Sequence, residues 1–146
     1  MTARLLAGCD VVDVARLSAA IDRREGLLAR VFTDRELADV RRDGVVPGSD
    51  VERHRLAARF AAKEATRKAL GDLRLPFHAA EVRRADDGAP QLWLHGVPSP
   101  LTLSMSHDAG VAIAFVVGFA APDAVAATDR PTGPPTDRPT DPPTDV

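Results

Sequence analysis

The spacing of apolar residues in the first part of the chain changes from a strand-like to a helix-like pattern. The stretch ARLLAGCDVVDV (3–14) is apolar enough for a buried strand that ends at Asp10 and leads into a turn of helix. Residues 14–28 then follow a helical period, with an apolar side formed by Val14, Leu17, Ile21 and Leu28. The pattern predicts a strand followed by an amphipathic helix.

Two capping patterns predict where the next helices begin. TDRE (33–36) places a threonine three residues before a glutamate, which predicts a capping box and a helix through about Arg42. Ser49 and Glu52 repeat this spacing at the start of a long helix, and Gly71 is suited to its C-terminal cap. We therefore expect a second short helix and then a long alanine-rich one.

The second half of the folded part is typical of β-strands. HAAEVRR (78–84) and PQLWLHG (90–96) flank an Asp-Gly pair, which is a strong hairpin signal. PLTLSMSHD (100–108) alternates apolar and polar residues, and GVAIAFVVGF (110–119) has the composition of a buried strand. Helices precede antiparallel strands, so the predicted class is α+β, with early helices packed on a late antiparallel sheet.

A change in composition near residue 121 predicts two regions. Residues 121–146 hold more than half of the chain's twelve prolines and few large apolar residues. Such a segment cannot bury enough apolar surface to offset the entropy of ordering. We expect one folded domain over residues 1–120 and a disordered tail rich in Pro, Thr and Asp over residues 121–146.

Composition narrows the class of protein. A single cysteine, Cys9, excludes an internal disulfide framework, and no signal peptide or membrane-length apolar run is found, so we expect a cytoplasmic protein that does not enter a membrane. The formal net charge of −2 does not favour a nucleic-acid binder. The sequence therefore predicts a soluble globular domain.

Three charged side chains are candidates for chemistry. Asp10 follows an apolar stretch, and Glu64 and Lys68 lie one turn apart on the alanine-rich helix. Mg²⁺ takes carboxylate oxygens together with water and phosphate oxygens, so Asp10 and Glu64 are candidate metal ligands, with Lys68 beside the phosphates. The alternative is that Glu64 and Lys68 form only an i,i+4 salt bridge on a solvated face. The spacing alone leaves both open.

Four motifs, taken in order, resemble a known family. GCDVV, RVFTDREL, RFAAKEATRKALG and LSMSHDAGVAIA are similar to the holo-acyl-carrier-protein synthase type of 4′-phosphopantetheinyl transferase. The likeness runs from about residue 5 to residue 118, and RFAAKEATRKALG (59–71) is its most specific part. It implies a fold of that family and an enzyme that moves the 4′-phosphopantetheine arm of coenzyme A to a serine of an apo acyl carrier protein. The by-product would be adenosine 3′,5′-bisphosphate.

The resemblance also implies roles for particular residues. Asp10 and Glu64 would hold Mg²⁺, and Lys68 would contact phosphate. Small members of the family are homotrimers with sites between subunits, so Ser106 and His107 would serve a neighbouring protomer's site. Phosphoryl transfer depends mainly on positioning and charge neutralisation, which these residue types can supply. The general base stays open between Glu64 and a water beside Asp10.

The resemblance places the carrier protein on the first helix. Carrier proteins of this kind are acidic, and Arg16 matches a family arginine that contacts them. Arg23 and Arg24 are further candidates, since arginine binds carboxylates well. For each of these two, a solvated surface charge is the competing interpretation.

The hairpin departs from the family pattern. Where the family usually has Gly-Lys-Pro near the adenine, this chain has Gly88, Ala89 and Pro90. Gly88 and Pro90 are therefore expected to border coenzyme A, without the basic residue between them. The connection 72–81 is also short. Two rival hypotheses remain: a non-catalytic relative that binds carrier protein or coenzyme A, and a structural domain whose Glu64–Lys68 pair is only a salt bridge.

Overall fold

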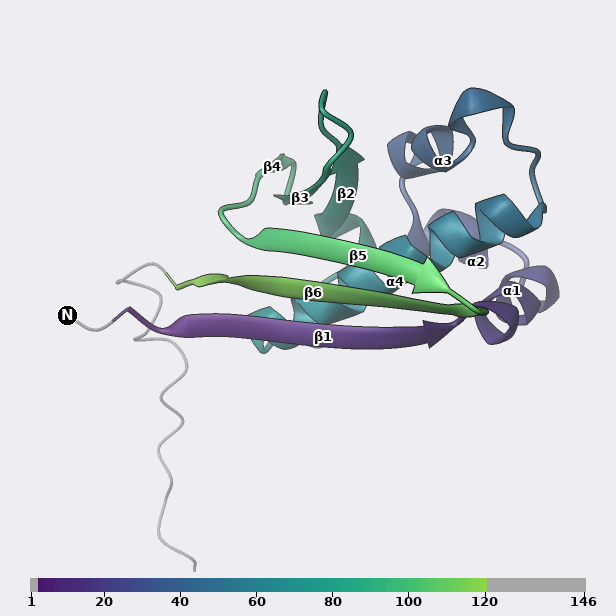
Figure 1. Ribbon diagram of the computed structural model, residues 1–146. Coiled ribbons are helices and arrows are strands. Elements are labelled where there is room, and N and C mark those ends of the chain that lie inside the picture. The colour runs from purple at the N-terminus through teal and green to yellow at the C-terminus, as the bar shows by residue number, and fades with distance from the viewer. Residues whose placement is uncertain (1–2, 121–146) are drawn as a thin grey trace, which may run out of the picture.

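The computed structural model describes residues 3–120, which form two three-stranded antiparallel sheets and a set of helices (Figure 1). The elements are β1 (Leu5–Asp13), α1 (Val14–Arg23), α2 (Leu27–Val31), α3 (Asp34–Val40), η1 (Arg42–Gly44), α4 (Asp50–Leu70), η2 (Phe77–Ala79), β2 (Ala80–Arg84), β3 (Pro90–Leu94), β4 (Val97–Pro98), β5 (Thr102–Asp108) and β6 (Val111–Phe119). The predicted α+β class is confirmed. The predicted tail, 121–146, lies outside the described residues.

The larger sheet has the strand order β1-β6-β5, and α4 runs along one of its faces (Figure 1). Asp10 lies opposite Ala114, which in turn lies opposite Met105. Alternate residues of a strand point to opposite faces, so Gly8, Asp10 and Val12 share the face covered by α4.

The long helix packs closely because its buried side is built of small residues. Ser49 caps its start by accepting a hydrogen bond from the Glu52 amide, and Gly71 caps its end. The buried alanines are Ala57, Ala58, Ala61, Ala62, Ala65 and Ala69. A Cβ on Gly8 would lie 1.9 Å from the Ala65 carbonyl oxygen, so β1 and α4 touch backbone to backbone. This close approach brings the inward side chains of β1 beside α4.

The smaller sheet, β2-β3-β4, is joined to the helices by a buried ion pair. Lys63 of α4 and Glu36 of α3 are both fully buried, with Nζ 2.8 Å from Oε2. Lys63 also donates to the carbonyls of Phe77 and Ala80, and Glu36 accepts from the Val82 amide. All three protons of the ammonium group are thus used, and α3, α4 and β2 are held together.

Several predicted boundaries were wrong. β1 continues through Asp10 to Asp13, and the expected helix over 14–28 is divided after Arg23, because Arg24 adopts an extended conformation. The helix that begins after Thr33 has the predicted capping box but ends at Val40.

Two further predictions were only half right. At Ser49 the cap is not reciprocal, since the Glu52 carboxylate binds Arg41 Nε at 2.6 Å instead of the cap's own backbone. β6 is buried only on its helix-facing side, and Phe115 is 49% exposed on the other. The β2–β3 hairpin and the Gly71 cap are confirmed.

Candidate active site

Asp10 and Lys68 meet across the junction between β1 and α4. Lys68 Nζ lies 2.7 Å from Asp10 Oδ1 and donates a second hydrogen bond to the Cys9 carbonyl at 3.0 Å. The Asp10 side chain is 16% exposed and that of Lys68 is 47% exposed. The alternative drawn from the sequence, a salt bridge between Glu64 and Lys68, is wrong. Lys68 pairs instead with Asp10, fifty-eight residues away in the chain.

Glu64 has a different cationic partner, which the sequence analysis missed. Arg67 donates to Glu64 Oε1 at 3.1 Å, and its guanidinium is fixed by two hydrogen bonds to the Leu75 carbonyl. It also stacks 3.7 Å from the centroid of the Phe77 ring. The i,i+3 spacing of Glu64 and Arg67 was a visible signal for this pair.

Both carboxylates open onto one cavity, the acidic cavity, of about 350 Å³. Its lining includes Asp10, Asp13, Arg16, Phe60 and Glu64. The strand and the helix therefore bring together the two acids that the sequence proposed as metal ligands. They do so because Asp10 lies on the inward face of β1 and Glu64 lies on the adjoining side of α4.

The charges of this site act on one another. The hydrogen bond from Lys68 to Asp10 raises the pKa of Lys68 above its ordinary value, and the negative charges of Asp10 and Glu64 act in the same direction. Lys68 is therefore fully protonated at neutral pH. It is a permanent cation bound to Asp10, one of the three carboxylates that line the acidic cavity.

The donor set fits Mg²⁺ better than a structural metal. Within residues 3–120 there is no group of three or more His, Cys, Asp or Glu side chains that would enclose an ion. Two carboxylates beside an open cavity leave other positions to water and phosphate oxygens, which is the coordination that Mg²⁺ prefers. Asp10 and Glu64 are thus suited to a metal shared with a phosphorylated substrate.

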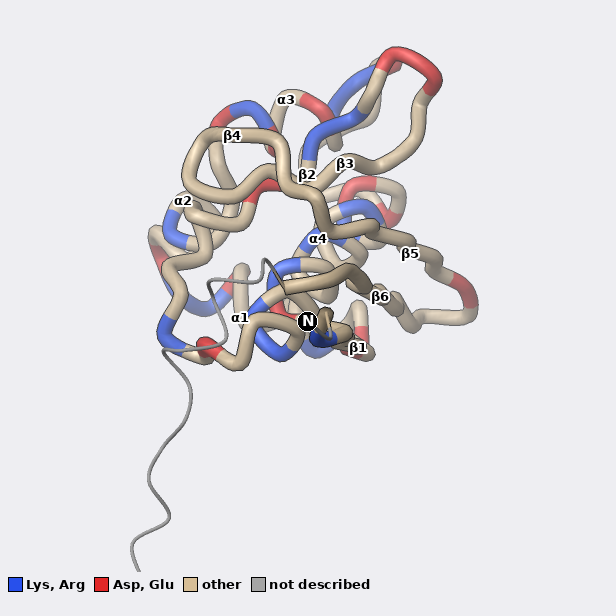
Figure 2. Tube along the Cα trace, turned by 90° about the vertical axis from the view of Figure 1, so that its left-hand side faces the viewer, with Lys and Arg blue, Asp and Glu red and all other residues tan. Residues whose placement is uncertain are grey.

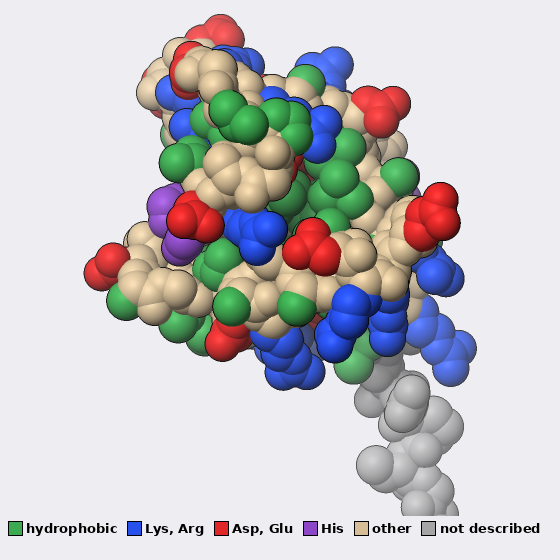
Figure 3. Space-filling model, turned by 90° about the vertical axis from the view of Figure 1, so that its right-hand side faces the viewer, with side chains coloured by type: hydrophobic (Ala, Val, Ile, Leu, Met, Phe, Trp, Pro, Cys, Tyr) green, Lys and Arg blue, Asp and Glu red, His purple; other side chains and the backbone are tan. Residues whose placement is uncertain are grey.

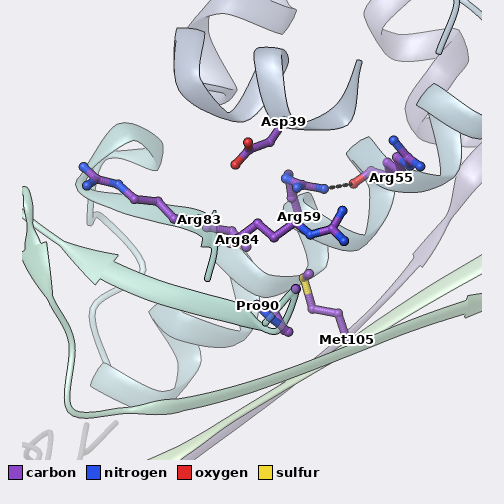
Figure 4. A pocket seen from close by; sticks show the side chains of 9 residues that line it. Asp39, Arg55, Arg59, Arg83, Arg84, Pro90 and Met105 are labelled. Carbon is purple, nitrogen blue, oxygen red and sulfur yellow. Dashed lines mark hydrogen bonds between the residues drawn. The ribbon is translucent and has the colours of Figure 1, made fainter. Parts of the chain in front are cut away.

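A second cavity, the arginine cavity, lies between α3, α4 and the β2–β3 hairpin (Figure 4). Its volume is about 170 Å³. It is lined by Asp39, Arg55, Arg59, Arg84, Gly88 and Pro90, among others. The two hairpin residues expected to border coenzyme A therefore face a cluster of arginines. The sequence analysis missed these arginines, because they come from separate helical and strand segments.

Ser106 and His107 are on β5, away from the acidic cavity. They are successive residues of a strand, so the pleat turns them to opposite faces of the sheet. The His107 ring lies 5.4 Å from that of His54, and both border a cavity with Arg55. Figure 3, which views the molecule from the right-hand side of Figure 1, shows histidine side chains beside acidic ones at its left edge. Within one chain the structure does not bring Ser106 or His107 to Asp10 and Glu64.

The three candidate arginines of the first helix are all exposed, but they differ in position. Arg16 lines the acidic cavity, and its amide donates to the capping carboxylate of Asp13. Arg23 donates from Nε to the Ala19 carbonyl in the last turn of α1, and Arg24 is the C-cap. Only Arg16 borders the proposed site.

The comparison with known families agrees with this arrangement. The model of the 4′-phosphopantetheinyl transferase superfamily matches residues 7–117. This chain belongs to that superfamily. The predicted family and enzyme class are thereby confirmed, and the match contains the strand with Asp10 as well as the helix with Glu64 and Lys68.

Individual relatives are similar over most of their length. A holo-[acyl-carrier-protein] synthase of Beutenbergia cavernae is 46% identical over 120 residues, which cover 75% of this chain and 93% of the relative. One from Frankia alni is 42% identical over 120 residues, covering 75% and 92%.

Solved structures show the same fold. The holo-(acyl-carrier-protein) synthase of Bacillus anthracis in complex with CoA (3′,5′-ADP) superposes with a TM-score of 0.67 at 28% identity, covering 82% of this chain and 100% of that one. The Helicobacter pylori holo-[acyl-carrier-protein] synthase in complex with coenzyme A gives a TM-score of 0.63 at 29% identity, covering 77% and 100%. The fold expected from the sequence is confirmed.

Proposed function

We propose that this protein is a holo-[acyl-carrier-protein] synthase, which transfers the 4′-phosphopantetheine arm of coenzyme A to a serine of an apo acyl carrier protein. The observation that carries the proposal is the opening of Asp10 and Glu64 onto one cavity, with Lys68 bound to Asp10. The names of the relatives support the same activity.

Asp10 and Glu64 are the residues that would hold Mg²⁺. When bound, the ion supplies positive charge to the diphosphate oxygens of coenzyme A. Lys68 reaches Asp10 Oδ1, so its positive charge lies beside a carboxylate that would hold the ion and would attract a phosphate oxygen. Arg67 keeps Glu64 in place, because its guanidinium binds the Glu64 carboxylate and is itself held by the Leu75 carbonyl and the Phe77 ring.

The reaction needs little covalent help from the protein. A new bond joins the carrier's serine oxygen to the β-phosphorus of coenzyme A, and the bond from that phosphorus to the bridging oxygen breaks. Adenosine 3′,5′-bisphosphate leaves with the bridging oxygen, and the serine proton passes to a base. Glu64 and a water beside Asp10 are the two candidates for that base.

The proposed docking surface for the carrier is α1 next to the acidic cavity. Arg16 links the two, since it is exposed on α1 and also lines the cavity. Figure 3 shows basic side chains along the lower part of this end of the molecule. An acidic carrier protein would be attracted to such a surface and oriented with its serine near Asp10 and Glu64.

We also propose a homotrimer in the cytoplasm. The sheet face turned away from α4 carries large apolar side chains at alternate positions, and Leu5, Val11 and Phe119 are 59%, 60% and 65% exposed. A continuous apolar strip of this kind favours burial against other copies of the chain.

Within the described residues, no helix combines the length and the apolar character needed to cross a membrane.

A direct assay tests the activity. The protein is incubated with coenzyme A, Mg²⁺ and apo carrier protein, and the carrier is weighed by mass spectrometry. We expect a gain equal to one phosphopantetheine arm. Asp10→Asn should lower the transfer rate more than about 100-fold, because a metal ligand is lost. The control variant Asp34→Asn, on the exposed start of α3, should keep the wild-type transfer rate.

The same assay separates the alternative. A non-catalytic relative would bind coenzyme A or carrier protein and leave the mass of several carriers unchanged. That outcome would replace the transferase proposal with the binding one.

A further inference from the structure

A pair of histidines lies where the start of α4 meets the end of β5, outside the candidate active site. The ring centroids of His54 and His107 are 5.4 Å apart, and the ring planes are tilted by 50°. Both residues border one cavity of about 520 Å³, the histidine cavity. No described residue lines both this cavity and the acidic cavity. Within one chain, the pair is therefore separate from the carboxylates proposed to hold Mg²⁺.

The spacing of the two rings fits a shared metal ion. An ion that two imidazole nitrogens hold tetrahedrally, each at about 2.0–2.1 Å, places the two ring centroids about 5 Å apart. The observed separation of 5.4 Å is close to this value. One ion can thus lie between His54 and His107 without a large movement of either backbone.

His54 is held in the tautomer that a metal ion requires. Its Nδ1 lies 2.7 Å from the Asp50 carbonyl oxygen. A carbonyl oxygen only accepts hydrogen bonds, so Nδ1 carries the proton and Nε2 keeps its lone pair. Histidines that bind metals commonly donate their other N–H to a carbonyl in this way, which fixes the ring and strengthens it as a ligand. The hydrogen bond to Asp50 therefore prepares Nε2 to bind a metal.

Both histidines belong to regular elements and not to flexible loops. His54 lies near the start of α4, which Ser49 caps. His107 lies on β5 opposite Ala112 of β6, a residue that is fully buried. The distance between the rings is thus set by the packing of α4 on the sheet, and sites built on such elements are precise.

The charges around the histidine cavity favour a cation. Asp50 and Asp108 line it, and within residues 3–120 neither carboxylate forms an ion pair. Asp108 ends β5, and the acidic segment where β5 turns into β6 is visible in Figure 2. Arg55 also lines the cavity, but its NH1 donates to the carbonyls of Val40 and Arg42 at 3.0 and 3.2 Å. Among the described lining residues, two carboxylates therefore outweigh one guanidinium.

The ligand type identifies the class of metal. Imidazole nitrogen suits Zn²⁺ and similar transition-metal ions, whereas Mg²⁺ prefers oxygen. In the part of the chain that the structure describes, no third His, Cys, Asp or Glu completes an enclosed group, so water fills the remaining positions of the ion. The left edge of Figure 3, where histidine side chains reach the surface, is open to solvent.

We propose that His54 and His107 bind one Zn²⁺ ion per chain, at a site distinct from the one proposed for Mg²⁺. The bound ion joins the start of α4 to the end of β5. The inference does not depend on the proposed transferase activity, because it rests on the two rings, the tautomer of His54 and the charge of the cavity.

The experiment titrates the full chain, free of any affinity tag, with Zn²⁺ in a calorimeter. Excess Mg²⁺ is present, so that Zn²⁺ does not compete at Asp10 and Glu64. We expect one Zn²⁺ per chain, and His54→Gln and His107→Gln should each weaken binding about tenfold or more, since even an outer partner of a metal ligand contributes that much. The matched control His78→Gln replaces an exposed histidine of η2 and should bind Zn²⁺ as tightly as wild type.

Two further measurements keep the test independent of the folding of any variant. A ligand that binds only the folded chain raises Tm, so Zn²⁺ should raise the Tm of wild type and His78→Gln but not that of either other variant. X-ray absorption at the zinc edge of the wild-type complex should show two imidazole ligands. The inference is overturned by an absence of Zn²⁺ binding, by a spectrum without two imidazoles, or by equal effects in all three variants. It is also overturned if binding is unchanged in either His54→Gln or His107→Gln.

Discussion

Gly8 shows how much of the site depends on a missing side chain. It precedes Asp10 by two positions, so both residues point toward α4, and the absence of a Cβ at Gly8 allows the helix backbone to lie against the strand. Asp10 reaches Lys68 because of this approach. The sequence indicated the importance of Asp10 but gave no reason for the glycine.

Gly8→Ala should therefore disturb both stability and activity. The added methyl group would lie 1.9 Å from the Ala65 carbonyl oxygen, and backbone cannot move away easily. Overpacking of this kind costs about 1–3 kcal/mol. Urea unfolding measures the loss, and Ala7→Ser, on the outward face of the same strand, is the control. Equal stability of Gly8→Ala and wild type would contradict the close packing described above.

At Arg16 the prediction concerns the carrier protein. Arg16→Glu should raise the KM for the carrier several-fold, because a favourable charge becomes repulsive toward an acidic partner, and should leave the KM for coenzyme A unchanged. Steady-state kinetics with each substrate varied in turn measures both. The matched variant Arg74→Glu reverses an exposed charge in the turn after α4. Unchanged carrier kinetics in Arg16→Glu would remove this residue from the docking surface.

Among the elements, α4 carries charged residues on two sides, one at the candidate active site and one in the interior. Glu64 lines the acidic cavity and Lys68 binds Asp10 of β1, whereas Lys63 points into the interior, where it is enclosed by Glu36 and two backbone carbonyls. Successive helix residues are about 100° apart, so neighbours such as Lys63 and Glu64 lie on different sides. The charges proposed for catalysis and the structural charge of Lys63 are thus separated by helix geometry alone.

Loss of the buried ammonium group should destabilise the fold strongly. Lys63→Met leaves the Glu36 carboxylate buried without its cation, for which a loss of about 3–5 kcal/mol is typical. The double variant Glu36→Leu/Lys63→Met should recover part of this loss, since no unpaired charge remains. Chemical denaturation measures both, and the exposed Arg30→Met is the control, expected within about 0.5 kcal/mol of wild type. A small effect in Lys63→Met would show that the pair contributes little.

At the scale of the whole molecule, the β1-β6-β5 sheet exposes large apolar side chains on the face turned away from α4, and no element of the described chain covers them. Phe115 is 49% exposed, and it lies opposite Cys9 and Ser104 in the register of the sheet. The sequence of β6 was interpreted as a buried strand. In the folded chain only its inner side is covered, by α4, and the proposed trimer would cover the other.

Phe115→Asp should abolish self-association, because it places a charge in the centre of the apolar strip. Analytical ultracentrifugation of wild type is expected to show a trimer, and that of the variant a monomer. Val46→Asp, which is 65% exposed in a loop outside the sheet, should stay trimeric. A monomeric wild type, or a Phe115→Asp variant that stays trimeric, would contradict the proposed assembly.

The sequence by itself determined the order of the elements, the α+β class, the Thr33 capping box, the hairpin and the identity of the family, because these depend on local spacing or on short ordered motifs. It also singled out Asp10, Glu64 and Lys68. Only the tertiary structure decided that Lys68 pairs with Asp10 and that arginines from α4 and β2 line the arginine cavity. These contacts join residues distant in the chain, and their partners are selected by the packing of α4 on the sheets, which no local pattern encodes.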